Sequence, residues 1–457
     1  MKIYVQILAA VFLAQAAGFA QPQPLTLNQA VQQAAEKYPA VRASVERVWV
    51  ADAGVSLART AYLPRADFLA QLNRATRNNE FGLVLPQSVI PSISGPVLGT
   101  NGLTNVWGSA TGVLVSWEPF DFGLRRAKVE AAQSGARRAQ ADVDLTRLEV
   151  QTAAADAFLT LLAAEQNVSA ARSGVERARA FEQAVGSLAT SGLRPGADAA
   201  RARAESALAR TQLSQAQQAA EVARASLSQF LGVEPAQIDA QPGLLLAMPP
   251  ETAPLAGSPA EHPLAREQQA AVEEVKASER VLASSYFPRF TLQGASYARG
   301  TGARTDGATG GAFSGVGPNI QNWALGMTVQ FNVMELPSLR ARREAELHRE
   351  LSEAAQYNRV VQDLDGQLAR ASAQLEGARR VALNTPVELE AARAAHEQAT
   401  ARYKTGLGSV AEVADAQRLL IQAETDDALA KLGVWRGLLA LAAARGDLQS
   451  FLQLAGR

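Results

Sequence analysis

The sequence predicts a mainly α protein with a small β part, in which long coiled-coil helical hairpins alternate with four short strands. Three observations lead to this fold class. Residues that favour helices, above all Ala, Gln, Glu, Arg and Leu, fill most of the 457 positions. Gly, Pro, Asn and aromatic residues gather in a few places, and beside them apolar and polar residues alternate with a period of two. The same order of segments also occurs twice along the chain.

The first twenty residues have the layout of a secretory signal. Lys2 precedes an apolar run at 7–14, and small residues end at Ala20, so we expect cleavage before Gln21. The run is far shorter than the roughly 20 residues that a transmembrane helix needs. A buried N-terminal helix is the alternative, but such a helix rarely shows this order of charge, apolar run and small residues. We therefore expect 1–20 to be a signal peptide and 21–457 to be one exported protomer.

Composition excludes several classes of function. The chain has no cysteine, so it offers no disulfide, no thiolate for a metal or a nucleophile, and no acceptor for an N-terminal lipid. Lys plus Arg and Asp plus Glu both number 44, a balance that gives no reason to expect nucleic acid as a partner. We expect no cofactor.

An internal repeat organises the chain into two segments, about 25–235 and 250–447. Tyr and Pro motifs recur at an offset of 224, and later positions recur at an offset of 214. The matched positions are Tyr38, Pro39, Tyr62 and Pro64 with His262, Pro263, Tyr286 and Pro288, and then Trp117, Gly192, Ala202 and Gly232 with Phe331, Gly406, Ala416 and Gly446. Each segment reads as helix, strand hairpin and two long helices.

The first helix should begin at Thr26, where Gln29 completes a capping box. We expect it to run to about Tyr62, before Pro64, with a possible break near Pro39.

Strand hairpins are expected at about 64–118 and 288–332. In the last strand Trp323, Leu325 and Met327 interleave with small or polar residues, which indicates one apolar and one wetter face. Such strands suit a membrane β-barrel, although an ordinary soluble sheet uses the same alternation. Long loops rich in Gly, Pro, Ser and Asn are expected at 80–105 and 299–322. Four strands cannot close a barrel, and hydrocarbon does not tolerate an open sheet edge, so several copies must contribute strands to one barrel.

Two long helices are expected at about 124–191 and 339–405, the second bent by Pro386. Residues at seven-residue intervals indicate coiled-coil packing: Leu145, Thr152 and Leu159, with Leu148, Ala155 and Leu162. Each long helix should end in a tight turn, at Gly192 and at Gly406, and return as a shorter helix capped by Asp198 or Ser409.

The chain resembles the TolC-like outer membrane efflux family. The resemblance covers essentially the whole mature chain and rests on the duplicated plan and on local segments at 117–123 (WEPFDFG), 403–407 (YKTGL) and 415–420 (DAQRLL). It implies a homotrimer with a twelve-stranded β-barrel in outer-membrane lipid and a periplasmic α-barrel. It also implies docking to a periplasmic adaptor protein and an inner-membrane pump of RND or ABC type. The second half departs from the pattern, since Pro337 replaces the counterpart of Gly123.

The resemblance also implies functional residues at the second hairpin. Glu412 and Asp415, three apart on one helix face, would form two rings of three carboxylates at a pore constriction and favour cations. A solvated charged face is the simpler interpretation of such a pair. Gly192, Leu193, Gly406 and Leu407 are the candidate contacts with the adaptor, and plain turn chemistry is the alternative. Some relatives have a latching arginine where this chain has Gly408, so Arg402 and Lys404 are the nearby candidates for ion pairs.

Two rival classes remain for comparison. An enzyme is disfavoured because the three histidines, His262, His348 and His396, lack metal-like spacing, and no phosphate loop or nucleophile elbow occurs. A periplasmic coiled-coil adaptor would have one helical hairpin between β-rich domains, whereas two are expected here. The exported cargo stays open between small molecules or metals and proteins of a type I system.

Overall fold

A computed structural model of the chain describes residues 23–76, 104–250, 258–304, 306 and 308–456. The expected signal peptide, and the expected loop between the first two strands up to residue 103, lie outside these residues. The chain divides into two compact units. The helical unit comprises the described residues of Met1–Arg47, Gln140–Gln268 and Tyr357–Arg457, and the sheet unit those of Val48–Ala139 and Gln269–Gln356.

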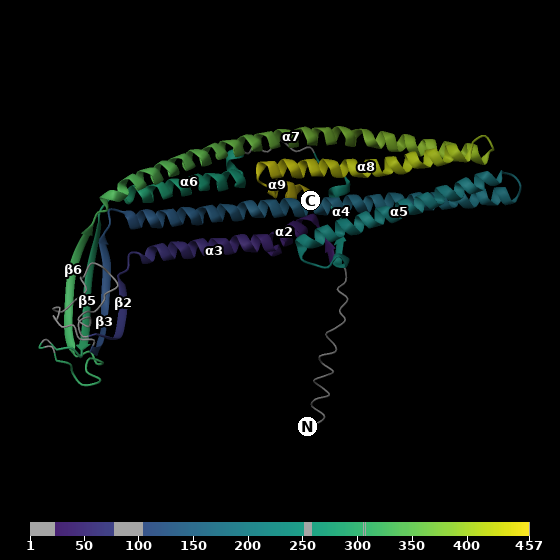
Figure 1. Ribbon diagram of the computed structural model, residues 1–457. Helices are drawn as coiled ribbons and strands as arrows, with labels where there is room; N and C mark the ends of the chain where they lie inside the picture. The colour runs from purple at the N-terminus through teal and green to yellow at the C-terminus, as the bar shows by residue number, and fades with distance from the viewer. Residues whose placement is uncertain (1–22, 77–103, 251–257, 305, 307, 457) are drawn as a thin grey trace, which may run out of the picture. The chain divides into compact units, whose positions relative to one another are not determined.

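The order of elements follows the expected plan, with differences at the joints. The segment predicted as the first helix forms two helices, because Tyr38 is extended and Pro39 starts a new helix, at the place where a break was expected. The predicted capping box of Thr26 and Gln29 is present. The helices are α2 (Leu27–Lys37), α3 (Pro39–Thr60), α4 (Leu124–Thr190), α5 (Gly196–Leu231), α6 (Pro263–Ser284), α7 (Leu336–Lys404), α8 (Val410–Arg445) and α9 (Gln449–Ala455) (Figure 1). The strands are β1 (Gln23–Leu25), β2 (Arg65–Thr76), β3 (Asn105–Phe120), β4 (Ile238–Ala240), β5 (Arg289–Thr301) and β6 (Ile320–Gln330).

The core of the helical unit gathers side chains from α2, α4, α5, α7, α8 and α9. The predicted coiled-coil positions Leu148, Ala155, Leu159 and Leu162 on α4 are all buried in it. Trp435 of α8 is 1% exposed and packs edge-on against Phe451 of α9, with ring centroids 6.3 Å apart. Its indole Nε1 donates a hydrogen bond to the carbonyl oxygen of Ala247 at 3.0 Å, which satisfies the only polar group of a fully buried side chain.

A short parallel strand pair was not predicted. β1 pairs with β4 over three residues, with Leu25 opposite Ala240, so the start of the first repeat is joined to its end. Leu25 packs against the same core that contains Ile238 and Ala240.

The sheet unit holds four antiparallel strands in the order β2-β3-β5-β6 (Figure 1). The register puts Phe68, Val113, Ser296 and Trp323 in one row and Trp117, Leu292 and Met327 in another on the same side, so apolar side chains of all four strands share one face. This face is exposed in the single chain, and Trp323 is 80% exposed. On the opposite face Ala110, Leu114, Ala295 and Tyr297 form a small buried cluster. The alternation predicted from the sequence is therefore confirmed, except that β6 ends at Gln330, before Phe331.

The two strand-to-helix bends differ in shape, and the second contains Pro337 where the first has Gly123. After β3, Phe122 and Gly123 have φ of 51° and 91°, and the Asp121 carboxylate accepts hydrogen bonds from the backbone N–H groups of Gly123 and Arg125. Burial alone would raise the pKa of Asp121, but these bonds and that from the Arg125 side chain outweigh it and lower the pKa. After β6, the chain makes a 3-10 turn at Val333–Glu335 instead. Pro337 then lies in the first turn of α7, where no N–H is needed.

His262 links the start of α6 to the end of α8 within the helical unit. Its Nδ1 accepts the backbone N–H of Leu264 at 3.1 Å, so Nε2 carries the proton and donates to the carbonyl oxygen of Ala443 at 3.1 Å. Burial lowers the pKa of His262, although the bond to Ala443 opposes this shift. The neutral ring is therefore the form that the folded chain favours.

We expect acid to weaken this joint. Because the folded pKa lies below the ordinary value, the unfolded chain binds the proton first, and stability falls as pH drops below about 6.5. Thermal unfolding followed by circular dichroism at about pH 7.5 and about pH 5.5 should show a smaller fall in Tm for His262→Gln than for the parent. The control is His348→Gln, which removes an exposed histidine of α7 and should behave like the parent. An equal fall in all three proteins would contradict the prediction.

Candidate functional site

The two hairpin ends are built on the same turn. At the end of α4, Leu193 N–H donates to Leu188 O and Gly192 N–H to Ala189 O. At the end of α7, Leu407 N–H donates to Arg402 O and Gly406 N–H to Tyr403 O. Both are Schellman motifs, and the glycines supply the left-handed residue, with φ of 73° and 82°.

The motif fixes an exposed leucine at each hairpin end. Leu193 is 71% exposed and Leu407 is 74% exposed. An apolar side chain held outward by a rigid turn covers no core of its own, so these two residues are suited to contact another protein. The sequence located both turns from glycine chemistry alone.

Gly408 is constrained by close packing rather than by its own backbone angle. A Cβ at this position would lie 3.1 Å from the Tyr403 N atom and 3.2 Å from the Cβ of Arg402. The backbone N–H of Gly408 also donates to Arg402 O at 3.0 Å. Any side chain here requires the neighbouring atoms of the turn to shift by a few tenths of an ångström.

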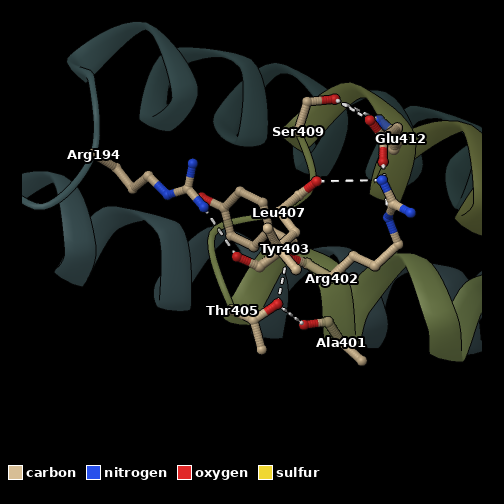
Figure 2. A network of polar contacts seen from close by, with 8 residues as sticks. All are labelled: Arg194, Ala401, Arg402, Tyr403, Thr405, Leu407, Ser409 and Glu412. Atoms are coloured by element: carbon tan, nitrogen blue, oxygen red, sulfur yellow. Dashed lines mark hydrogen bonds and ion pairs between the residues drawn. The ribbon is translucent and has the colours of Figure 1, made fainter.

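The predicted acidic pair lies exposed at the start of α8, and each carboxylate has an arginine beside it. Figure 2 shows Glu412 next to Arg402, whose Nε is 3.8 Å from Glu412 Oε2, and Ser409, whose hydroxyl caps the helix by accepting the Glu412 N–H at 3.2 Å. Asp415 pairs with Arg418 one turn further along α8. The sequence placed the acids on one helix face and named Arg402 as a candidate for an ion pair. It did not identify Glu412 as the partner of Arg402, nor the pairing of Asp415 with Arg418. Exposed pairs of this kind contribute under about 1 kcal/mol each.

The prediction of a cap at Asp198 is wrong. α5 begins at Gly196 after Pro195, which makes no side-chain cap, and Asp198 lies inside the first turn. Proline already fixes the backbone for a helix start, and the aspartate instead interacts favourably with the helix dipole.

Arg194 joins the two hairpins, a contact that sequence reasoning missed. Its Nη2 donates to the Tyr403 carbonyl oxygen at 3.0 Å, and its guanidinium lies over the Tyr403 ring, 4.6 Å from the centroid (Figure 2). The Tyr403 side chain packs in a cluster with Val185, Ala202, Val410 and Val413. Burial raises the pKa of the Tyr403 phenol. No nearby sequence signal pairs position 194 with position 403, since the two are brought together only by the fold.

Further along the hairpins, two more contacts hold α4 to α8. Arg177 forms two hydrogen bonds to the Glu424 carboxylate, at 3.3 and 2.7 Å. Gln417 Nε2 donates to the Gly174 carbonyl oxygen at 3.0 Å, in a buried position. Both pairs are partly or fully shielded from water, so they specify which faces of the two hairpins meet.

Within the described ranges, no group of three or more His, Cys, Asp or Glu side chains could hold a metal ion. None of the helices that the structure describes combines the length and the apolar character that a membrane crossing requires.

The chain matches a known protein family and a curated relative over most of its length. The model of the family described as "Outer membrane efflux protein" matches residues 30–233 and 259–447. Protein CyaE of Bordetella pertussis is 27% identical over 445 residues, which cover 93% of this chain and 84% of CyaE.

Solved outer-membrane channels share the fold. The outer-membrane channel OprN has a TM-score of 0.72 at 22% identity and covers 92% of this chain and 89% of its own. The open state of the MtrE outer membrane channel of Neisseria gonorrhoeae has a TM-score of 0.72 at 20% identity, covering 94% and 93%.

Proposed function

The chain belongs to the outer membrane efflux protein family, and from this premise we propose that three copies assemble into one conduit. It is an outer-membrane channel component of an efflux or type I secretion system, through which cargo passes from the periplasm to the exterior. Its relatives are passive channel proteins, and we propose that this chain likewise catalyses no reaction. The partners proposed are a periplasmic adaptor protein and an inner-membrane pump.

The apolar face of the sheet unit is the observation that carries the proposal. Strands β2, β3 and β6 present Phe68, Val113, Leu325 and Trp323 on one exposed face, a patch far too apolar for contact with water. In the described residues β2 and β6 each pair with one strand, so two sheet edges are open. Lipid against the apolar face, and strands of neighbouring copies against both edges, satisfy both features together.

At the hairpin ends we propose that Glu412 and Asp415 line the narrow part of the conduit. In a threefold trimer each becomes a ring of three carboxylates. Arg402 and Arg418 lie beside them and reduce the net charge, so the expected cation preference is moderate.

The test is single-channel conductance of the purified protein in a planar bilayer. We expect discrete, cation-preferring steps. We also expect that the double variant Glu412→Ala with Asp415→Ala lowers the cation-to-anion permeability ratio by about twofold or more and weakens block by multivalent cations. Asp198→Ala, at the equivalent place on the first hairpin, is the matched control and should change the ratio less.

Each outcome is informative. Steps with unchanged selectivity in the double variant would remove the two acids from the pore while leaving the channel. Failure of the parent protein to insert at all would argue for a soluble periplasmic coiled-coil scaffold.

A further inference from the structure

A basic groove runs along the first hairpin, between α4 and α5. It has a volume of about 860 Å³ and is lined by Arg179, Arg203 and Arg210 against one acid, Glu182. Glu182 Oε2 is 3.7 Å from Arg210 Nη2, so it offsets only part of the charge of the three arginines. The groove therefore has an unbalanced positive charge along most of its length.

The groove lies on the side of the first hairpin that is turned away from the second hairpin of the same chain. On α4, Arg177 and Phe181 face the second hairpin, where they contact Glu424 and Tyr403. Groove residues such as Arg179 and Glu182 are roughly 100° to 160° round the helix from Phe181, at about 100° per residue. A ligand in this groove therefore cannot be the second hairpin of the same molecule.

An acidic stripe lies on the second hairpin, on the outward side of α7. Glu390 and Glu397 are seven residues apart, both are exposed, and both lie roughly 150° round the helix from the buried Ala392. In the part of the chain that the structure describes, neither carboxylate forms an ion pair. One basic residue, Arg393, lies beside the stripe.

The arginines of the groove and the glutamates of the stripe lie at equal distances from the ends of their hairpins. Arg203 and Arg210 are seven and fourteen residues from the start of α5 at Gly196. Glu397 and Glu390 are seven and fourteen residues from the end of α7 at Lys404. Arg203 and Glu397 therefore each lie about 10 Å from the end of their own hairpin, and Arg210 and Glu390 each lie about 21 Å from it. The two hairpin ends share one turn geometry.

The first hairpin itself shows that a residue count from the turn measures position along a hairpin. Gln183, seven residues before the end of α4 at Thr190, lines the same groove as Arg203, seven residues after the start of α5. Equal residue counts from the turn thus correspond to equal positions along the hairpin.

We propose that each basic groove receives the acidic stripe of a second copy of this chain, with Arg203 opposite Glu397 and Arg210 opposite Glu390 of the neighbouring copy. This inference rests on the proposed trimer and adds which faces meet and in what register. Two charge pairs with heptad spacing fix the sliding position of one hairpin against the next, which is the usual effect of charged pairs flanking coiled-coil contacts.

Disulfide cross-linking tests the register directly, because the chain has no cysteine of its own. The variant Arg203→Cys with Glu397→Cys is oxidised in detergent, and covalent dimers and trimers are counted on a denaturing gel. The matched control, Arg203→Cys with Glu376→Cys, keeps the second thiol on the same exposed stripe but moves it 21 residues, or about 30 Å, along α7. We expect at least about fivefold more cross-linking in the first variant, since neighbours in a trimer hold matched thiols at high effective concentration.

The mass of each variant, measured by light scattering before oxidation, separates this inference from the proposed trimer. A trimer that cross-links equally in both variants, or in neither, would overturn the register and leave the trimer intact. A monomeric mass for the parent protein would overturn both. Charge reversal provides a second readout: Arg203→Glu with Arg210→Glu should lower the temperature of trimer dissociation, and adding Glu397→Arg with Glu390→Arg should restore it. An acidic adaptor helix as the true occupant predicts no rescue.

Discussion

Replacing Trp435 with alanine should lower the free energy of unfolding by about 3–5 kcal/mol, the largest loss that we expect from one substitution. Trp435 is 1% exposed and lies in the main core of the helical unit with Phe158, Leu227 and Phe451. Alanine would leave a large cavity there and would also leave the buried carbonyl of Ala247 without its donor. Urea unfolding of the purified protein, followed by far-UV circular dichroism at one fixed protein concentration, measures the change.

Trp435→Phe separates the two contributions. Phenylalanine keeps much of the volume and the edge-on contact with Phe451, but it cannot donate to Ala247. We expect a loss of about 1–3 kcal/mol, mostly from the unpaired carbonyl. If both variants lost the same free energy, the hydrogen bond rather than the packing would dominate at this site.

The long helices could be predicted from the sequence because their signals are local. α4 ends at Thr190, one residue before the expected end, where a glycine turn stops a long run without proline. The capping box at Thr26 and the exposed tips at Leu193 and Leu407 follow from the same short-range chemistry.

Contacts between distant segments could not be predicted in this way. The β1–β4 pair joins residues more than two hundred positions apart, and each strand is only three residues long, too short for a period to be visible. Arg194 meets Tyr403 by the packing of one hairpin on another. Arg402 was named as an ion-pair candidate from its place near the turn, but its partner Glu412 could not be chosen from the sequence. The pore role of Glu412 and Asp415 and the boundaries of the two repeats stay predictions.

The hairpin ends should be the place where charge is least tolerated in the cell. We expect Leu193→Asp with Leu407→Asp to reduce export by about 10-fold to 100-fold if these exposed leucines contact the proposed adaptor, because the new charges must lose water on docking. Both side chains are largely exposed and the turns depend on Gly192 and Gly406, so folding should change by no more than about 0.5 kcal/mol. Export from cells with the adaptor and pump present measures the first effect, and bilayer conductance of the purified variant measures the second.

Two control variants make the result specific to the tips. Leu193→Met with Leu407→Met keeps an apolar side chain at each turn and should retain most of the export. Leu208→Asp adds a charge at an exposed leucine within α5, away from the turn, and should leave export close to that of the parent. Lost export with normal conductance would place the defect in docking, because the conduit itself still passes ions. Normal export from the double aspartate variant would mean that the leucines are exposed only as a by-product of the Schellman turn, and that the adaptor binds elsewhere on the hairpins.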